Sequence, residues 1–257
     1  MKVVLISPDI IWEKEIENIN NYNLLVNRIF SKHHNIDLMV FPEFFSTGFS
    51  VRNDICDTQD NSYSLRWVFK TSNENNIAIL VSLPIKEDGK RYNRAFFVKP
   101  DGSYQYYNKR HLFSYGGENR LFTPGNKFTI VEYKGFKIGL NICYDLRFPV
   151  WTRNIGLEYD LLINVANWPS SRSSVIEPLA KARAIENLSY FAFVNRSGND
   201  NESSYNGERY LFDYMGRAIT PEKDGSFFSV FDLSLDSLNE FRSKFIAWQD
   251  ADNFKIV

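Results

Sequence analysis

Strand-like and helix-like patterns alternate along almost the whole of this 257-residue chain, and no linker, repeat or low-complexity stretch separates them. Some neighbouring strand patterns are joined by a helical pattern, whereas others are joined directly by a turn such as Pro-Asp-Gly at 100–102. This mixture indicates mixed sheets, and the strands are more numerous than one sheet usually carries. We therefore predict an α/β fold in which two sheets pack face to face with helices outside, a four-layer α-β-β-α sandwich. The expected strands are 2–7, 36–42, 77–83, 91–99, 103–107, 127–133, 136–142, 159–166, 189–195, 210–213, 217–220 and 227–232, and the expected helices are 12–32, 63–74, 178–187 and 235–245.

The composition excludes several classes of function. Hydrophobic residues make up 44% of the chain and charged residues 24%, which is ordinary for a globular protein, and the net charge is −1. That balance predicts no binding to nucleic acid or to an anionic membrane surface. Two cysteines and three histidines predict neither a disulfide framework nor a metal site. The first apolar run is too short for a signal peptide or a membrane span, so we expect a cytoplasmic protein.

Cys143 occupies the most informative position for function, because it directly follows the alternating segment 136–142 and precedes the polar segment Tyr-Asp-Leu-Arg. A strand that ends in a sharp turn can present a thiol beside free backbone N–H groups, which directs a nucleophile at a carbonyl or nitrile carbon. An isolated cysteine is more often a buried structural residue, so the interpretation depends on its neighbours. Cys56 lies in a polar loop without a base nearby in the sequence, and we expect it to be inert.

Two charged residues share the topological position of Cys143. Glu43 follows the apolar segment 38–42, and Lys109 follows the segment 104–107. Such residues are usually solvated, but a carboxylate can take the proton of a thiol, and an ammonium can stabilise a thiolate and an oxyanion. His111 is a rival base, because it lies two residues from Lys109 and a cysteine–histidine pair is the commoner arrangement in cysteine hydrolases. Spacing alone does not choose between Lys109 and His111.

Three segments resemble the signatures of the nitrilase superfamily, also called the carbon–nitrogen hydrolases: 41–49, 108–113 and 139–149. They occur in the order of that family, and further matches lie at 166–169, Arg172, 182–187 and 194–200. The resemblance implies a single α-β-β-α domain over 1–257, which needs no metal or organic cofactor. It also implies a homodimer or larger homo-oligomer, and we expect the segment from about 235 to 257 in the subunit contacts.

The resemblance also assigns roles to individual residues. Glu43 would be the general base and acid, Lys109 the oxyanion stabiliser and Cys143 the nucleophile that forms a thioester. Glu118 matches a second glutamate that orients the substrate or the hydrolytic water. The backbone N–H of Tyr144, which follows the nucleophile, would be the second oxyanion donor.

Within the superfamily the chain is most similar to the bacterial omega-amidases, which hydrolyse the terminal amide of 2-oxoglutaramate, 2-oxosuccinamate and related compounds. The segments 167–172, 205–207 and 241–254 carry this likeness. A substrate with a distal carboxylate suits an arginine beside the site, because the guanidinium binds a carboxylate with two hydrogen bonds. Arg172 is the first candidate and Arg147 the alternative, and Trp168 is expected to line the substrate site.

Other functions share the same three residues. The alternatives are another amidase of the superfamily, acting on deaminated glutathione or on N-carbamoyl compounds, or a nitrilase. A binding protein without catalytic activity on the same fold is a further alternative, although all three expected catalytic residues are present.

Overall fold

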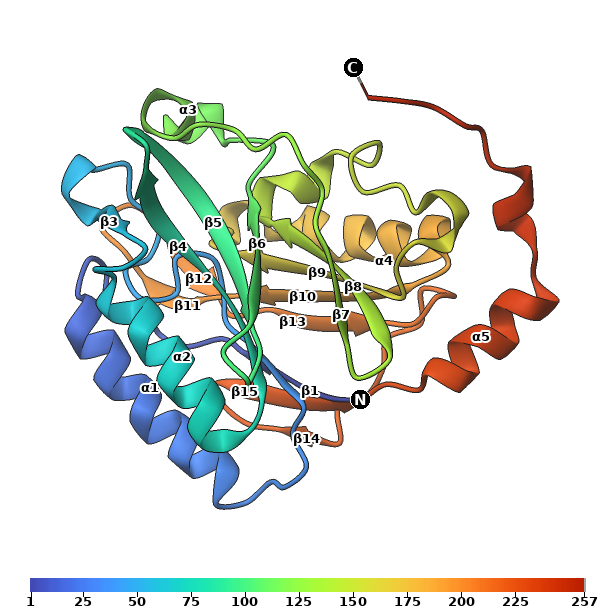
Figure 1. The fold of residues 1–257 in the computed structure, drawn as a ribbon, viewed down its shortest axis with the longest axis horizontal. Helices are drawn as coiled ribbons and strands as arrows, with labels where there is room; N and C mark the ends of the chain where they lie inside the picture. Colours follow the sequence, from blue (N-terminus) through green and yellow to red (C-terminus); the bar gives the residue numbers. More distant parts are fainter. Residues whose placement is uncertain (257) are drawn as a thin grey trace.

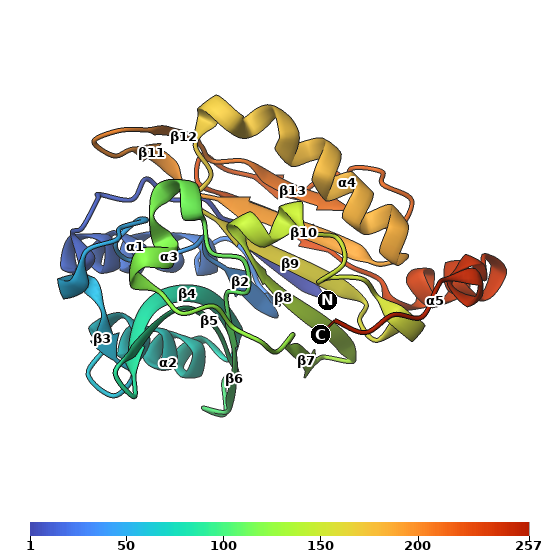
Figure 2. The same cartoon turned by 90° about the horizontal axis from the view of Figure 1, so that it is seen from above.

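The computed structural model describes residues 1–256 and has four layers. Two sheets face each other, helices α1 and α2 cover the outer face of the larger sheet, and α4 covers the outer face of the smaller one (Figures 1 and 2). The predicted α-β-β-α sandwich is therefore confirmed. The helices are α1 (Glu15–Phe30), α2 (Tyr63–Asn75), α3 (Glu118–Leu121), α4 (Ile176–Asn187) and α5 (Leu235–Lys244).

The larger sheet has eight strands, of which β1, β2 and β4 run parallel to one another. β3 also pairs parallel with β4, whereas the pairs β14–β15, β15–β1, β4–β5 and β5–β6 are antiparallel. The predicted strand 77–83 continues to Glu87 and turns directly into β5, so β4 and β5 form a long hairpin that the sequence pattern missed. In spatial order the strands are β14 (Lys223–Asp224), β15 (Phe228–Asp232), β1 (Lys2–Ile6), β2 (Leu38–Val40), β4 (Ala78–Glu87), β5 (Lys90–Val98) and β6 (Tyr104–Asn108), with β3 (Asp57–Thr58) beside β4.

The smaller sheet has five strands, and its three central strands are parallel. Its order is β13 (Arg209–Phe212), β10 (Tyr190–Asn195), β9 (Leu161–Ala166), β8 (Phe136–Ile142) and β7 (Ile130–Tyr133). A two-stranded hairpin of β11 (Ser197–Asn199) and β12 (Ser204–Asn206), also missed from the sequence, follows β10.

The predicted hairpin between 210–213 and 217–220 is confirmed in part. Residues 209–212 form β13, and the chain turns back so that Phe212 and Ala218 make an antiparallel bridge. The backbone N–H groups of Asp213 and Ile219 donate across this turn to the Arg217 and Leu211 carbonyls at 2.9 and 2.8 Å. Residues 217–220 form no strand beyond this bridge, and the antiparallel pairing of β13 with β10 on its other edge was missed from the sequence.

Side chains of successive strand residues point to opposite faces of the sheet, and they form two hydrophobic cores. Val3 and Leu5 on β1 point into the core between the sheets, and Val4 and Ile6 point into the core under α1 and α2. Two helices begin at serine caps: Ser62 on α2 accepts a hydrogen bond from the backbone N–H of Leu65, and Ser234 on α5 accepts one from that of Ser237. Burial on both faces explains why these strands are almost continuously apolar.

Helix α5 and the segment after it extend away from the four layers (Figure 1). Arg242 anchors α5 to the body, because its guanidinium donates to Asp160 at 2.6 Å and to the Tyr159 carbonyl at 2.7 Å. Several apolar side chains beyond the helix are exposed, among them Phe245 and Ile246. Among residues 1–256 no helix is long and apolar enough to cross a membrane.

Candidate active site

Cys143 lies on a strained turn directly after β8. Its φ angle is +43°, in the left-handed region that residues with a Cβ rarely adopt, and a 3₁₀ turn over Cys143–Arg147 follows. The buried Asp145 carboxylate stabilises this turn by accepting a hydrogen bond from the backbone N–H of Ile142 at 3.1 Å. The predicted sharp exit from the strand is therefore confirmed, and it places the thiol where the two sheets meet.

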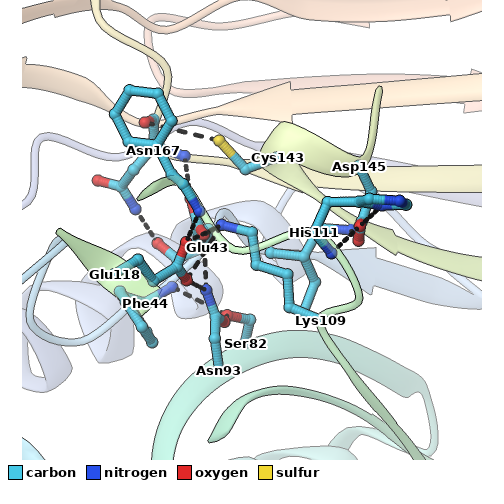
Figure 3. A network of polar contacts seen from close by, with 12 residues as sticks. Glu43, Phe44, Ser82, Asn93, Lys109, His111, Glu118, Cys143, Asp145 and Asn167 are labelled. Atoms are coloured by element: carbon cyan, nitrogen blue, oxygen red, sulfur yellow. Dashed lines mark hydrogen bonds and ion pairs between the residues drawn. The ribbon is translucent and has the colours of Figure 1, made fainter. Parts of the chain in front are cut away.

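Glu43 and Lys109 reach the same place from the larger sheet. Glu43 lies three residues beyond β2, and Lys109 directly follows β6. Both side chains are buried, and the Lys109 Nζ atom lies 2.8 Å from Glu43 Oε1 (Figure 3). Single charged residues at strand ends are usually solvated, whereas these two are buried against each other.

Glu118 is a second buried carboxylate on the same ammonium. Its Oε2 atom lies 2.9 Å from Lys109 Nζ and accepts a hydrogen bond of 2.6 Å from the backbone N–H of Phe113. Asn93, on β5, donates its side-chain amide to Glu118 at 2.9 Å and to Glu43 at 2.7 Å. Lys109 is therefore enclosed by two carboxylates that a shared amide also joins.

Asn167, which directly follows β9, connects the two sheets at the site. Its backbone N–H donates to Glu43 Oε2 at 2.9 Å, and its side-chain amide donates to the Glu43 carbonyl oxygen. Its own carbonyl oxygen lies 3.8 Å from the Cys143 sulfur. The Glu43 carboxylate from one sheet and the Cys143 thiol from the other thus contact the same residue.

Burial and charge together set the protonation of this cluster. Burial, with the Glu43 carboxylate second, raises the pKa of the Cys143 thiol well above its usual value, and Lys109 opposes this shift. Burial disfavours the ammonium of Lys109, but Glu118 and Glu43 outweigh it and raise the pKa of Lys109. The resting thiol is therefore protonated, and it needs a base to become a nucleophile.

His111 does not face the thiol. Its ring Nδ1 lies 2.8 Å from Asp145 Oδ1, its backbone N–H donates to the same oxygen, and its ring stacks on Phe148 with centroids 3.9 Å apart. Lys109 instead contacts Glu43 and Glu118, so the two side chains diverge (Figure 3). The geometry therefore favours Lys109 over His111 as the partner of Cys143.

A cavity of about 480 Å³ opens over the thiol. The predicted catalytic residues, Tyr144 and the predicted substrate-binding residues line it, whereas Glu118 and His111 do not. Arg147 is exposed and its guanidinium lies 5.0 Å from the centroid of Trp168, whereas Arg172 is half-buried over Phe113 at 5.1 Å. The lining residues include Glu43, Lys109, Cys143, Tyr144, Arg147, Trp168 and Arg172.

Three polar residues of the site were missed as contributors from the sequence. Asn93 stands in a strand pattern that gives no sign of its contacts, and Asn167 and Asp145 lie inside segments that were recognised without assigning them roles. In the described part of the chain, no group of three His, Cys, Asp or Glu side chains could hold a metal ion. The site that does form consists of a thiol, two carboxylates and an ammonium.

The chain is similar to several known proteins. The model of the carbon–nitrogen hydrolase family matches residues 4–242. The chain is 34% identical to omega-amidase YafV of Escherichia coli K12, over 100% of this chain and 98% of that protein. It is 30% identical to the 2-oxoglutaramate amidase of Bacillus subtilis, with 82% of each chain covered.

A solved structure is also closely similar. XC1258 from Xanthomonas campestris, a CN-hydrolase superfamily protein with an arsenic adduct in its active site, superposes with a TM-score of 0.93 at 33% identity. The alignment covers 100% of this chain and 99% of that one. The chain therefore belongs to the carbon–nitrogen hydrolase family, as the sequence signatures predicted.

Proposed function

We propose that this protein hydrolyses a linear carboxamide through a thioester on Cys143, with Glu43 and Lys109 as the other catalytic residues. The observation that carries the proposal is the convergence of thiol, carboxylate and ammonium at the base of one cavity. The raised pKa of the Cys143 thiol, caused first by burial and then by Glu43, means that proton transfer must accompany attack. Glu43 has the position and the charge to accept that proton.

In the acylation step, Glu43 takes the Cys143 proton and the sulfur attacks the amide carbon, giving a tetrahedral oxyanion. Lys109 Nζ and the backbone N–H of Tyr144 stabilise this oxyanion. The C–N bond then breaks, Glu43 returns the proton to the leaving nitrogen, and ammonia departs from a thioester. Water, deprotonated by Glu43, attacks the thioester and releases the carboxylic acid and the thiol. Glu118 keeps Lys109 charged and in place.

We further propose that the substrate is an omega-amide, a terminal amide with a carboxylate at its other end, such as 2-oxoglutaramate or 2-oxosuccinamate. Arg147 and Arg172 lie at the cavity, and within residues 1–256 neither guanidinium forms an ion pair with a carboxylate. A planar guanidinium binds a carboxylate with two parallel hydrogen bonds. The names of the two curated relatives, an omega-amidase and a 2-oxoglutaramate amidase, support the same substrate class.

A substrate panel tests this function. Ammonia release should be fastest with 2-oxoglutaramate or 2-oxosuccinamate and slow with deaminated glutathione, N-carbamoyl amino acids and simple nitriles. Mass spectrometry of acid-quenched enzyme should detect an acyl adduct on Cys143. Preference for a carbamoyl compound or a nitrile would refute the omega-amide proposal, and the absence of any adduct or ammonia across the panel would favour a binding protein.

We also propose that the protein assembles as a homodimer or larger oligomer in the cytoplasm, where the thiol stays reduced. Support comes from α5 and the segment after it, which extend from the body and expose Phe245 and Ile246 at 51% and 52%. Light scattering should give at least twice the chain mass. Replacing Phe245 and Ile246 by serine should shift the protein toward the monomer, and an unchanged mass would exclude these residues from the contact.

A further inference from the structure

Asn93 brings a neutral amide into the cluster of charges without lining the cavity. The residue is fully buried, and its Nδ2 group donates to Oε1 of Glu43 at 2.7 Å and to Oε1 of Glu118 at 2.9 Å (Figure 3). Its backbone carbonyl accepts a hydrogen bond of 2.9 Å from the backbone N–H of Lys109. Asn93 therefore contacts the proposed base, the second carboxylate and the lysine segment at once.

The orientation of this amide is fixed by Ser82 on the neighbouring strand β4. The Ser82 hydroxyl accepts from the backbone N–H of Phe44 at 3.2 Å and lies 2.8 Å from Asn93 Oδ1. A backbone N–H can only donate, so the hydroxyl points its own proton toward Asn93, which leaves the NH₂ group for the carboxylates. Phe44 directly follows Glu43, so this series of hydrogen bonds begins at the backbone N–H beside Glu43 and ends at the Glu43 carboxylate.

The surroundings of Glu118 consist of hydrogen-bond donors. Lys109 reaches both of its oxygens, Asn93 donates to one and the Phe113 N–H to the other. A protonated carboxyl needs an acceptor for its proton, and within residues 1–256 no acceptor is bonded to this one. Burial raises the pKa of Glu118 and Glu43 adds to this shift, whereas Lys109 and Asn93 oppose it.

Glu43 differs from Glu118 because it also meets the thiol. It accepts hydrogen bonds from Asn93, Lys109 and the backbone of Asn167, and its carboxylate acts on the Cys143 thiol, whose pKa burial and then Glu43 raise. The ionisable groups that face it are thus Lys109, Glu118 and Cys143, and Tyr205 on β12 faces Cys143 in turn. A proton that leaves the thiol therefore has one carboxylate within reach that can take it.

We propose that Asn93, oriented by Ser82, is a positioning residue that keeps both carboxylates ionised and so reserves the thiol proton for Glu43. The inference rests on the proposed role of Glu43 as the base. Without the amide, the two carboxylates would keep only the shared ammonium and one backbone N–H each, and their mutual repulsion would raise the proton affinity of one of them. As the pH falls, Glu43 would then become protonated, and unable to accept the thiol proton, at a higher pH than in the wild type.

The test compares Asn93→Ala and Ser82→Ala with the wild type and with Asn154→Ala. Asn154 is a matched control, because it is also buried and fully bonded, to Tyr159 and Asn187, but lies outside the cluster. Two pH profiles are measured: the rate of Cys143 alkylation by iodoacetamide, and kcat/KM for the best amide substrate. Thermal unfolding records how much stability each variant loses.

Loss of a hydrogen bond to a charged group should move the acid limb of both profiles about one pH unit upward in Asn93→Ala. Ser82→Ala keeps the NH₂ group of Asn93 but removes the hydrogen bond that orients it. The acid limb of this variant should therefore move in the same direction by a smaller amount. Asn154→Ala should lower the unfolding temperature and leave the limb unchanged. If Asn93→Ala does not fold, the direction of the Ser82→Ala shift decides the test.

An acid limb that stays at the wild-type pH in folded Asn93→Ala, or in Ser82→Ala where that variant decides, would overturn the proposal. An equal shift in Asn154→Ala would also overturn it, because general destabilisation would then explain the effect. Alkylation requires no hydrolysable substrate. A wild type that is alkylated normally but releases no ammonia would therefore refute the proposed function without affecting this result.

Discussion

At the base of the cavity, Glu43, Lys109 and Glu118 are shielded from solvent, and each charge contacts another charge of the cluster. At the rim, the guanidinium groups of Arg147 and Arg172 lie over aromatic rings, and in the described part of the chain no carboxylate pairs with them. Charges that contact one another are fixed in geometry at a desolvation cost, whereas free charges at a rim remain available to a ligand. We therefore expect the charges at the bottom of the cavity to determine the reaction and the arginines at the rim to select the substrate.

The largest expected effect is at the base, from Cys143→Ala. Turnover should fall by at least about 10⁴-fold, because no thioester can form without the sulfur. The unfolding temperature should stay close to that of the wild type, since alanine keeps the same Cβ at the left-handed φ. Ammonia release and calorimetry measure the two quantities, and substantial remaining activity would exclude Cys143 as the nucleophile.

Lys109→Met should rank second and should affect both activity and stability. Loss of the oxyanion donor should lower kcat by about 10³-fold, and two uncompensated carboxylates should destabilise the fold by about 3–5 kcal/mol. His111→Ala serves as the comparison, and it should cost less than about tenfold in kcat. Steady-state kinetics and denaturant titration separate these outcomes, and the reverse order would restore His111 as the candidate base.

Substitutions at the rim should change affinity more than rate. Arg172→Met should raise KM for an omega-amide by about 10- to 100-fold, as expected for a lost hydrogen-bonded charge pair, and should leave kcat within a few-fold. Arg52→Met is the matched control, because Arg52 also lines the cavity but already pairs with Glu13 and Asp54. Equal effects in both variants, or an equal effect on an uncharged amide, would contradict the proposed role of Arg172. Arg147→Met tests the alternative arginine in the same way.

The smallest expected effect comes from the second cysteine. Burial raises the pKa of Cys56 to about 11, so at pH 8 only about one thiol in a thousand is ionised. Cys56→Ser should leave kcat and KM within about twofold of the wild type. Peptide mapping after brief alkylation at pH 8 should find Cys56 almost unmodified, and rapid labelling there would contradict its assignment as inert.

The sandwich could be predicted because its buried strands are short apolar runs with turn residues between them. Such runs can be recognised from the local sequence without knowing which strand they pair with. Prediction from the sequence failed where pairing was decided at long range. The pattern at 210–213 predicted the turn to the following segment but not the pairing of β13 with β10, because no local pattern encodes the register of Phe191 with Phe212. The Asp88-Gly89 turn between β4 and β5 was likewise passed over.

The site was predictable in part for the same reason. Glu43, Lys109 and Cys143 stand at recognisable strand ends, and the family signatures drew attention to them. Asn93 could not be found in this way, because its importance comes from facing two carboxylates that lie 50 and 25 residues away in the chain. A buried amide is a common structural residue, and only the three-dimensional arrangement distinguishes this one.

Glu43 and Lys109 belong to the eight-stranded sheet, whereas Cys143 and Asn167 belong to the five-stranded sheet. Neither layer alone contains both a nucleophile and its base. During refolding, ammonia release should therefore return only when the two layers have docked, later than helix content recovers. The recovery of activity during refolding should therefore report when the interface between the two sheets has formed. Stopped-flow refolding with a continuous ammonia assay would measure the rate of that step.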